Sequence, residues 1–148
     1  MADVQTRTTP ITQIHQQLQS AFNQRDWDTL RRHIADECVY VDHARGETAR
    51  GPEEATALYR SWAEAFSDAE IPEGALFDRS ERTSISRFVG RGTQDGALGP
   101  FPPSGRYAET SFCELLRFNE HGRVVHGEIY YDQLTMLLQL GHVPTPQG

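Results

Sequence analysis

The sequence predicts an α+β fold in which helices come first and an antiparallel sheet follows. Up to about residue 67, apolar residues recur at the three- and four-residue spacing of amphipathic helices. Beyond that point the spacing changes to two, and segments of strand composition are separated by turns rich in Gly, Pro and Asn. Helices that precede such a run of strands are expected to pack against one face of a curved sheet.

The helices are predicted from their first residues and their apolar faces. Thr9 as N-cap and Pro10 as first helical residue begin a helix that extends to about residue 23. Asp26 can cap a shorter helix, and Gly51-Pro52 open a third that stops near residue 67. A last short helix is LTMLLQLG. The apolar faces comprise Ile11, Ile14, Leu18 and Phe22, then Trp27, Leu30 and Ile34, then Ala55, Leu58, Trp62 and Phe66.

The strands follow from composition and alternation. CVYVDH, residues 38–43, is the first, and ARGETARG after it is predicted to be a loop. Further strands are predicted over about 71–78, 83–92, 106–118 and 123–132. The 148 residues suffice for one domain, 1–148, with flexible ends at 1–8 and 145–148.

Charge and hydropathy exclude several classes of partner. The net charge of −7, without a basic stripe, disfavours nucleic acid and anionic membranes and favours a small neutral or cationic ligand. No apolar run approaches the roughly 18 residues of a membrane span, and the first residues do not resemble a signal peptide. A cytoplasmic location is therefore expected. Cys38 and Cys113 lie in predicted strands and are expected to be inert buried thiols.

One carboxylate is predicted on the core face of the long strand 106–118. Alternation gives that face Thr110, Phe112, Glu114, Leu116 and Phe118. A four-residue hairpin loop at 119–122 would set Leu116 opposite Val125, Glu114 opposite Gly127, Phe112 opposite Ile129 and Thr110 opposite Tyr131. Glu128 then lies on the other face, and a one-residue slip would be needed to turn it inward.

Each acidic residue has two interpretations. Desolvation can make Glu114 a general acid or base, or Glu114 forms a buried ion pair with an arginine such as Arg87 or Arg91. Glu128 is an outward carboxylate or a dimer contact, unless the register differs. Tyr40 and Asp42 share one face of the first strand. They can orient a substrate oxygen or a water at the mouth of a cavity, or Asp42 and His43 simply begin a polar loop.

No cofactor is expected. His43 and His126 are too few and too poorly spaced to indicate a metal site. The chain also lacks a Gly-rich phosphate loop, a nucleophile signature and a dinucleotide-binding fingerprint.

The order of elements and several short motifs resemble the SnoaL-like polyketide cyclases of the nuclear transport factor 2-like superfamily. The likeness extends from about residue 11 to 144. Relatives commonly read Gly-Thr-His-x-Gly where this chain has Gly92-Thr93-Gln94-Asp95-Gly96. Other matches are Pro102-Pro103-Ser104-Gly105-Arg106, Asp132-Gln133-Leu134 and Gln139-Leu140-Gly141.

The resemblance implies a cone-shaped fold: a strongly curved, mostly antiparallel sheet around three helices, enclosing an apolar cavity and usually dimeric. Members work without a cofactor, by placing carboxylates and hydrogen-bond donors in a dry pocket. Two positions depart from the family pattern. Ile129 occupies the position where the cyclases carry a catalytic Asp on the last strand, and Gln94 replaces the usual His. Tyr40-x-Asp42 resembles the water-holding Tyr-x-Asn pair of the limonene-epoxide hydrolases.

The function expected from these observations is acid–base catalysis on an apolar, oxygenated polyketide or terpenoid intermediate, by ring closure, isomerisation or epoxide opening. Asp42 or Glu114 would transfer the proton, with Glu128 in the alternative register, and Tyr40 would hold the reacting oxygen. Substrate contacts are expected from Tyr131, Gln94, His43, Phe112, Ile129 and Trp62. Two alternatives stay open: a limonene-epoxide-hydrolase-like enzyme, and a non-catalytic small-molecule binding protein, which Ile129 favours.

Overall fold

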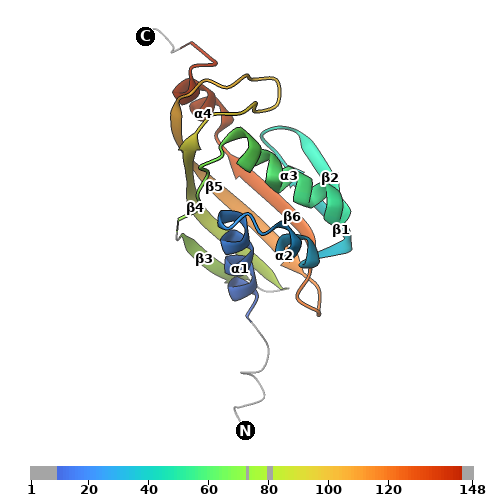
Figure 1. Cartoon of the computed structure of the whole chain (residues 1–148). Coiled ribbons are helices and arrows are strands. Elements are labelled where there is room, and N and C mark those ends of the chain that lie inside the picture. Colours follow the sequence, from blue (N-terminus) through green and yellow to red (C-terminus); the bar gives the residue numbers. More distant parts are fainter. Residues whose placement is uncertain (1–9, 73, 80–81, 145–148) are drawn as a thin grey trace.

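The computed structural model describes residues 10–72, 74–79 and 82–144 (Figure 1). The predictions for Thr9 and for flexible ends at 1–8 and 145–148 lie outside these residues. The elements are α1 (Ile11–Asn23), α2 (Trp27–Arg32), β1 (Ile34–Asp42), β2 (Glu47–Arg50), α3 (Gly51–Ala65), β3 (Ala75–Arg79), β4 (Thr83–Thr93), β5 (Tyr107–Phe118), β6 (Val124–Tyr131) and α4 (Gln133–Leu140).

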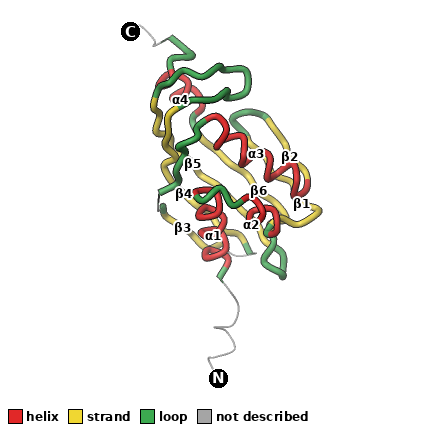
Figure 2. Tube along the Cα trace, in the orientation of Figure 1, coloured by secondary structure: helices red, strands yellow, loops and turns green. Residues whose placement is uncertain are grey.

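The strands form one six-stranded sheet in the order β2-β1-β6-β5-β4-β3. Only the β1–β6 pair is parallel among the described strands. Helices α1, α2 and α3 lie over one face of the sheet (Figure 1). The short helix α4 lies at one end of the sheet, beside the long loop between β4 and β5 (Figure 2). The predicted α+β class, with helices on one face of a mostly antiparallel sheet, is confirmed.

Helix ends follow the predicted capping chemistry in part. Asp26 caps α2 by accepting a hydrogen bond from the Thr29 backbone N–H, at 3.2 Å. Asp132 caps α4 in the same way through Thr135. Pro10, predicted as the first helical residue, instead occupies the N-cap position with an extended ψ, so α1 begins at Ile11. None of the described helices is long and apolar enough to cross a lipid bilayer.

Three segment boundaries were predicted wrongly. The segment 44–51 was expected to be a loop, but Glu47–Arg50 pairs with β1 as an antiparallel strand, because Gly46 at φ +66° lets the chain reverse tightly. Ile34 begins β1 rather than ending the second helix. Strand β3 begins at Ala75 rather than near residue 71, and before it Glu70 forms an isolated bridge with Arg91.

The last hairpin keeps the predicted faces but not the predicted register. Glu114 lies opposite Ile129 and Leu116 opposite Gly127, two residues from the expected pairing. One residue of this shift comes from a hairpin loop that covers 119–123 rather than 119–122, and the other from an irregularity between Arg117 and Phe118. Because side chains alternate with period two, a shift of two residues preserves which side chains face the core. Glu114 is therefore buried, as predicted, and Glu128 lies on the opposite face.

Candidate active site

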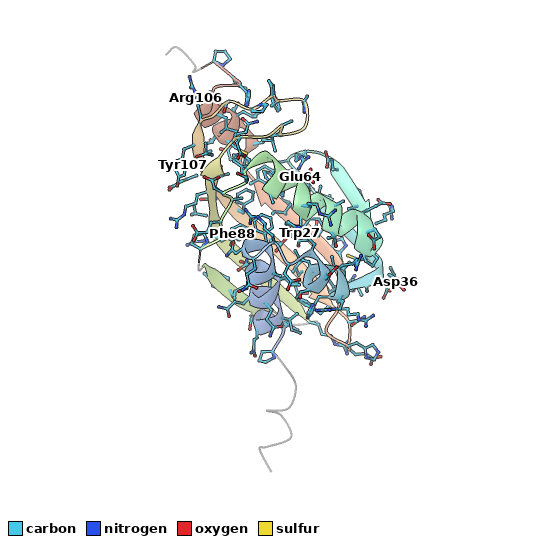
Figure 3. All side chains as sticks on the ribbon, viewed as in Figure 1. Trp27, Asp36, Glu64, Phe88, Arg106 and Tyr107 are labelled. Atoms are coloured by element: carbon cyan, nitrogen blue, oxygen red, sulfur yellow. The ribbon has the colours of Figure 1, made fainter. Side chains whose placement is uncertain are left out.

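An elongated cavity lies between helices α1 and α3 and the inner face of the sheet. The space inside it that the centre of a water molecule can occupy has a volume of about 80 Å³. Its walls are mainly apolar and aromatic, and they include the predicted substrate contacts Trp62, Phe112 and Ile129. Phe88 stacks on Phe112 with ring centroids 5.2 Å apart, and Trp62 meets Phe112 edge-on at 5.6 Å. In Figure 3 the Phe88 side chain lies within the body of the molecule, whereas Asp36 and Arg106 lie at its periphery.

Glu114 is the buried acidic residue that lines this cavity. Its side chain is buried, with 4% of the residue exposed, and it accepts hydrogen bonds from three elements. His15 Nε2 of α1 lies 2.9 Å from Oε1, and the Tyr59 hydroxyl of α3 lies 2.7 Å from Oε2. The Tyr40 hydroxyl of β1 makes a short hydrogen bond to the same Oε2. Two phenol hydroxyls thus converge on one oxygen of a carboxylate in an apolar pocket.

Each of these donors is positioned by its local sequence. His15 lies on the buried face of α1, and its Nδ1 is 2.8 Å from the Ser84 hydroxyl of β4. Because a carboxylate only accepts hydrogen bonds, Nε2 of His15 is the atom that donates to Glu114. Tyr40 reaches Glu114 across β6 because Gly127, beside it in the parallel pair, has no side chain. A Cβ on Gly127 would overlap the Tyr40 ring, 2.8 Å from Cε2.

The hydrogen bonds decide the protonation state of this cluster. Burial opposes ionisation of Glu114, but the bond and charge of His15 and the bonds of the two tyrosines outweigh burial and hold the pKa of this carboxyl below its usual value. Burial and the Glu114 charge raise the pKa of Tyr40 and of Tyr59 well above 10. At neutral pH the site therefore contains a carboxylate that can accept a proton and two phenols that stay protonated and can donate hydrogen bonds.

The lowered pKa of Glu114 predicts how stability changes with pH. A carboxyl whose pKa is lower in the folded than in the unfolded chain stabilises the fold above its unfolded pKa of about 4.3, and this contribution is lost as pH falls through the folded value. Urea denaturation of the parent protein and of Glu114→Gln, between about pH 6 and pH 3, should show the stability advantage of the parent shrinking on acidification. The other carboxyl groups are the same in both proteins, so their contributions to the pH dependence cancel in this comparison. A difference that is independent of pH would contradict the assignment.

Buried Asp42 and half-buried Tyr131 form a second hydrogen-bonded pair, separate from Glu114. The Asp42 carboxylate accepts a hydrogen bond from the Tyr131 hydroxyl at 3.1 Å and from the Arg45 backbone N–H at 2.9 Å. Burial raises the pKa of Asp42 in spite of these bonds. Neither residue is among those that line the cavity. Tyr40 and Asp42 share the buried face of β1, as predicted, but their side chains hydrogen-bond to different partners, Glu114 and Tyr131.

Glu128 and His43 lie together on the outer face of the sheet. His43 Nε2 is 2.8 Å from a Glu128 carboxylate oxygen, and the His43 ring stacks on Tyr130 with centroids 4.3 Å apart. The Glu128 side chain is 25% exposed and the His43 side chain 40%. In this structure neither residue reaches the cavity.

Gln94, expected to contact substrate, instead holds two loops together. Its amide nitrogen donates to the backbone carbonyls of Gly96, Phe101 and Pro102, and its carbonyl oxygen lies 2.7 Å from His142 Nε2. The side chain is fully buried but does not line the cavity.

The alternative of an ion pair between Glu114 and an arginine is wrong. Strand pairing places Ser86 opposite Glu114, and Arg87 is opposite Cys113 on the outer face. Arg91 pairs with Glu70 at 3.1 Å. Cys38 is buried, as predicted, and burial raises the pKa of its thiol to about 11, whereas Cys113 is only half-buried.

His15, Tyr59 and Ser84 are the site residues that sequence reasoning missed. A usable signal existed for His15, because it falls between Ile14 and Leu18 on the apolar face of α1. Tyr59 sits next to Leu58 at the edge of the apolar stripe of α3 and carried no comparable signal. Within 10–72, 74–79 and 82–144, no cluster of three or more His, Cys, Asp and Glu side chains could hold a metal ion.

Comparison with known proteins identifies the family. The sequence model described as SnoaL-like polyketide cyclase matches residues 12–140. IdmH, a candidate polyketide cyclase from Streptomyces antibioticus, is 26% identical with a TM-score of 0.76, over 90% of this chain and 99% of that one. TsrD from Streptomyces laurentii is 22% identical with a TM-score of 0.78, over 90% and 96%. None of the curated proteins matches significantly. The match over residues 12–140 establishes that the chain belongs to the SnoaL-like polyketide cyclase family.

Proposed function

We propose that this protein is a cofactor-independent cyclase or isomerase that acts by proton transfer on an apolar, oxygenated polyketide-type intermediate. The observation that carries the proposal is the position of Glu114, an ionised carboxylate at the wall of an aromatic cavity, with Tyr40 and Tyr59 donating to it. Membership of the SnoaL-like family supports a cyclase or isomerase role in general. The burial and hydrogen bonds of Glu114 support this residue as the acid–base group, in place of the family's usual Asp on the last strand.

The proposed reaction begins with a carbonyl compound bound in the cavity beside Tyr59. Glu114 Oε2 takes a proton from the carbon next to the carbonyl, and the electron pair moves to the carbonyl oxygen to form an enolate. A tyrosine hydroxyl, released from the carboxylate as it becomes protonated, donates a hydrogen bond to the enolate oxygen. The enolate carbon then attacks a second carbonyl of the same molecule, and Glu114 returns the proton to the new alkoxide oxygen. Protons and charge balance over the two steps.

Proton abstraction can be tested without the natural substrate. The probe is 2-tetralone, a two-ring aromatic ketone with acidic protons beside its carbonyl, and exchange of these protons in D₂O is followed by NMR. We expect the protein to accelerate exchange over buffer and over an equal concentration of denatured protein. Exchange at the buffer rate would reject proton transfer as the function.

A second candidate, a non-catalytic binding protein for a small apolar molecule, is favoured by one specific feature. Both oxygens of Glu114 are already engaged by protein donors, so the carboxylate can be a satisfied structural group beneath a binding pocket. Such a protein would bind 2-tetralone without accelerating its exchange. The same NMR sample measures both properties.

A further inference from the structure

The cavity contains a second polar group that the proposed chemistry does not use. Thr110 lines the cavity and is 5% exposed, and its hydroxyl has no hydrogen-bond partner within the described part of the chain. A buried hydroxyl without a partner costs about 1–3 kcal/mol, so such groups are rare in folded proteins. A threonine at this position therefore requires an explanation that the protein alone does not supply.

The residues that face Thr110 offer its hydroxyl no hydrogen-bond partner. Directly opposite it on β4 is Gly90, which also lines the cavity, and the next facing pair is Gly92 and Ala108. None of these side chains can hydrogen-bond with the Thr110 hydroxyl. The charged residues that line the cavity near this pair, Glu70 and Arg91, bind each other at 3.1 Å. Thr110 is thus the polar group left unpaired at this end.

Thr110 and Glu114 are four residues apart on the same face of β5, so their Cα atoms are about 13 Å apart. Between them lies Phe112, whose ring stacks on Phe88 at an interplanar angle of 9°. Gly90 makes this possible, because a Cβ there would lie 2.8 Å from Phe112 Cε2. The wall between the two polar ends is therefore aromatic, and the rings of an aromatic ligand can pack against it.

We infer that the Thr110 hydroxyl hydrogen-bonds to a second oxygen of the bound molecule, at the end opposite the oxygen that lies beside Glu114 and Tyr59. A hydrogen bond of about 2.8 Å at each end leaves at least about 7 Å between the two ligand oxygens, a span that two fused rings cover. Rotation about χ1 exchanges the hydroxyl and methyl groups of threonine, so the hydroxyl can meet either a carbonyl or a hydroxyl of the ligand. Thr110 is then a specificity-determining residue. This inference rests on the proposed function only for the substrate class.

The test compares two probes that differ in the distal oxygen. Naphthalene-2,6-diol has an oxygen at each end, and 2-naphthol has one; both are titrated calorimetrically into the parent protein and into Thr110→Val, Thr110→Ser and Thr56→Val. Thr56 is the matched control, since its hydroxyl is also buried and unpartnered among the described residues but does not line the cavity. We expect the parent to prefer the diol. Thr110→Val should weaken diol binding roughly fivefold, the equivalent of one neutral hydrogen bond, and change 2-naphthol binding less than about twofold.

Thr110→Ser, which keeps the hydroxyl, should retain the preference, and Thr56→Val should change neither probe. Equal affinity of the parent for both probes, or no binding of either, would overturn the inference. Equal weakening of both probes in Thr110→Val would overturn it too, because the loss would then reflect packing. Binding is measured without turnover, so this result stands or falls independently of the 2-tetralone exchange that tests the proposed function.

Discussion

Replacing Glu114 by glutamine is expected to slow the exchange of 2-tetralone protons by about 10²- to 10⁴-fold, the usual contribution of one positioned acid–base group. The amide has nearly the same shape as the carboxylate and can still accept hydrogen bonds from Tyr40 and Tyr59 through its carbonyl oxygen. It cannot accept a proton from carbon. The rate is measured by NMR on protein whose thermal unfolding has first been shown to be cooperative.

Two further amide substitutions make this result specific. Glu128→Gln removes a carboxylate on the outer face of the same sheet and should leave the exchange rate within about twofold, as for a surface substitution. Asp42→Asn removes the other buried carboxylate, which binds Tyr131 but does not line the cavity. Losses below tenfold at Glu114, Asp42 and Glu128 alike would reject acid–base catalysis by any of them. A large loss at Asp42 alone would move the catalytic role to that residue.

The face on which Glu114 lies could be predicted from sequence because alternation along β5 is uninterrupted. From Thr110 to Phe118, every second residue is buried. The register of the β5–β6 hairpin could not be predicted, since the irregularity between Arg117 and Phe118 adds a shift that a side-chain pattern does not encode. As a result, Gly127, predicted to lie opposite Glu114, lies opposite Leu116. Its missing side chain makes room for the Tyr40 ring.

The partners of Glu114 depend on how elements pack, which periodicity does not determine. The apolar face of α1 was predicted, and His15 lies on it, but its bonds to Ser84 and Glu114 require α1 to lie across β4 and β5. Gln94 shows the opposite case. Its place in a family motif indicated a substrate contact, whereas its buried amide binds loop carbonyls. A family motif shows which residue of this chain occupies a given position, but the contacts of its side chain depend on the surrounding backbone.

The Gly127→Ala substitution should both destabilise the fold and disturb the site. The new methyl group would overlap the Tyr40 ring and lie 3.0 Å from Leu116 Cδ2, in a part of the core where neither can move freely. Overpacking of this kind costs about 1–3 kcal/mol of the free energy of unfolding, measured by urea denaturation. The ring must also shift away from Glu114, so 2-tetralone exchange should fall at least tenfold, because a misplaced hydrogen-bond donor stabilises the enolate poorly.

A double substitution distinguishes this cause from a general weakness of the strand. Tyr40→Val removes the ring carbons that the new methyl group would meet, so Gly127→Ala should cost less in that background than in the parent protein, by about 1 kcal/mol or more. Glu128→Ala, the next residue on the outer face, should change stability by less than about 0.5 kcal/mol. If Gly127→Ala destabilised both backgrounds equally, the methyl group would be meeting Leu116 rather than Tyr40. The glycine would then have no part in bringing the Tyr40 hydroxyl to Glu114.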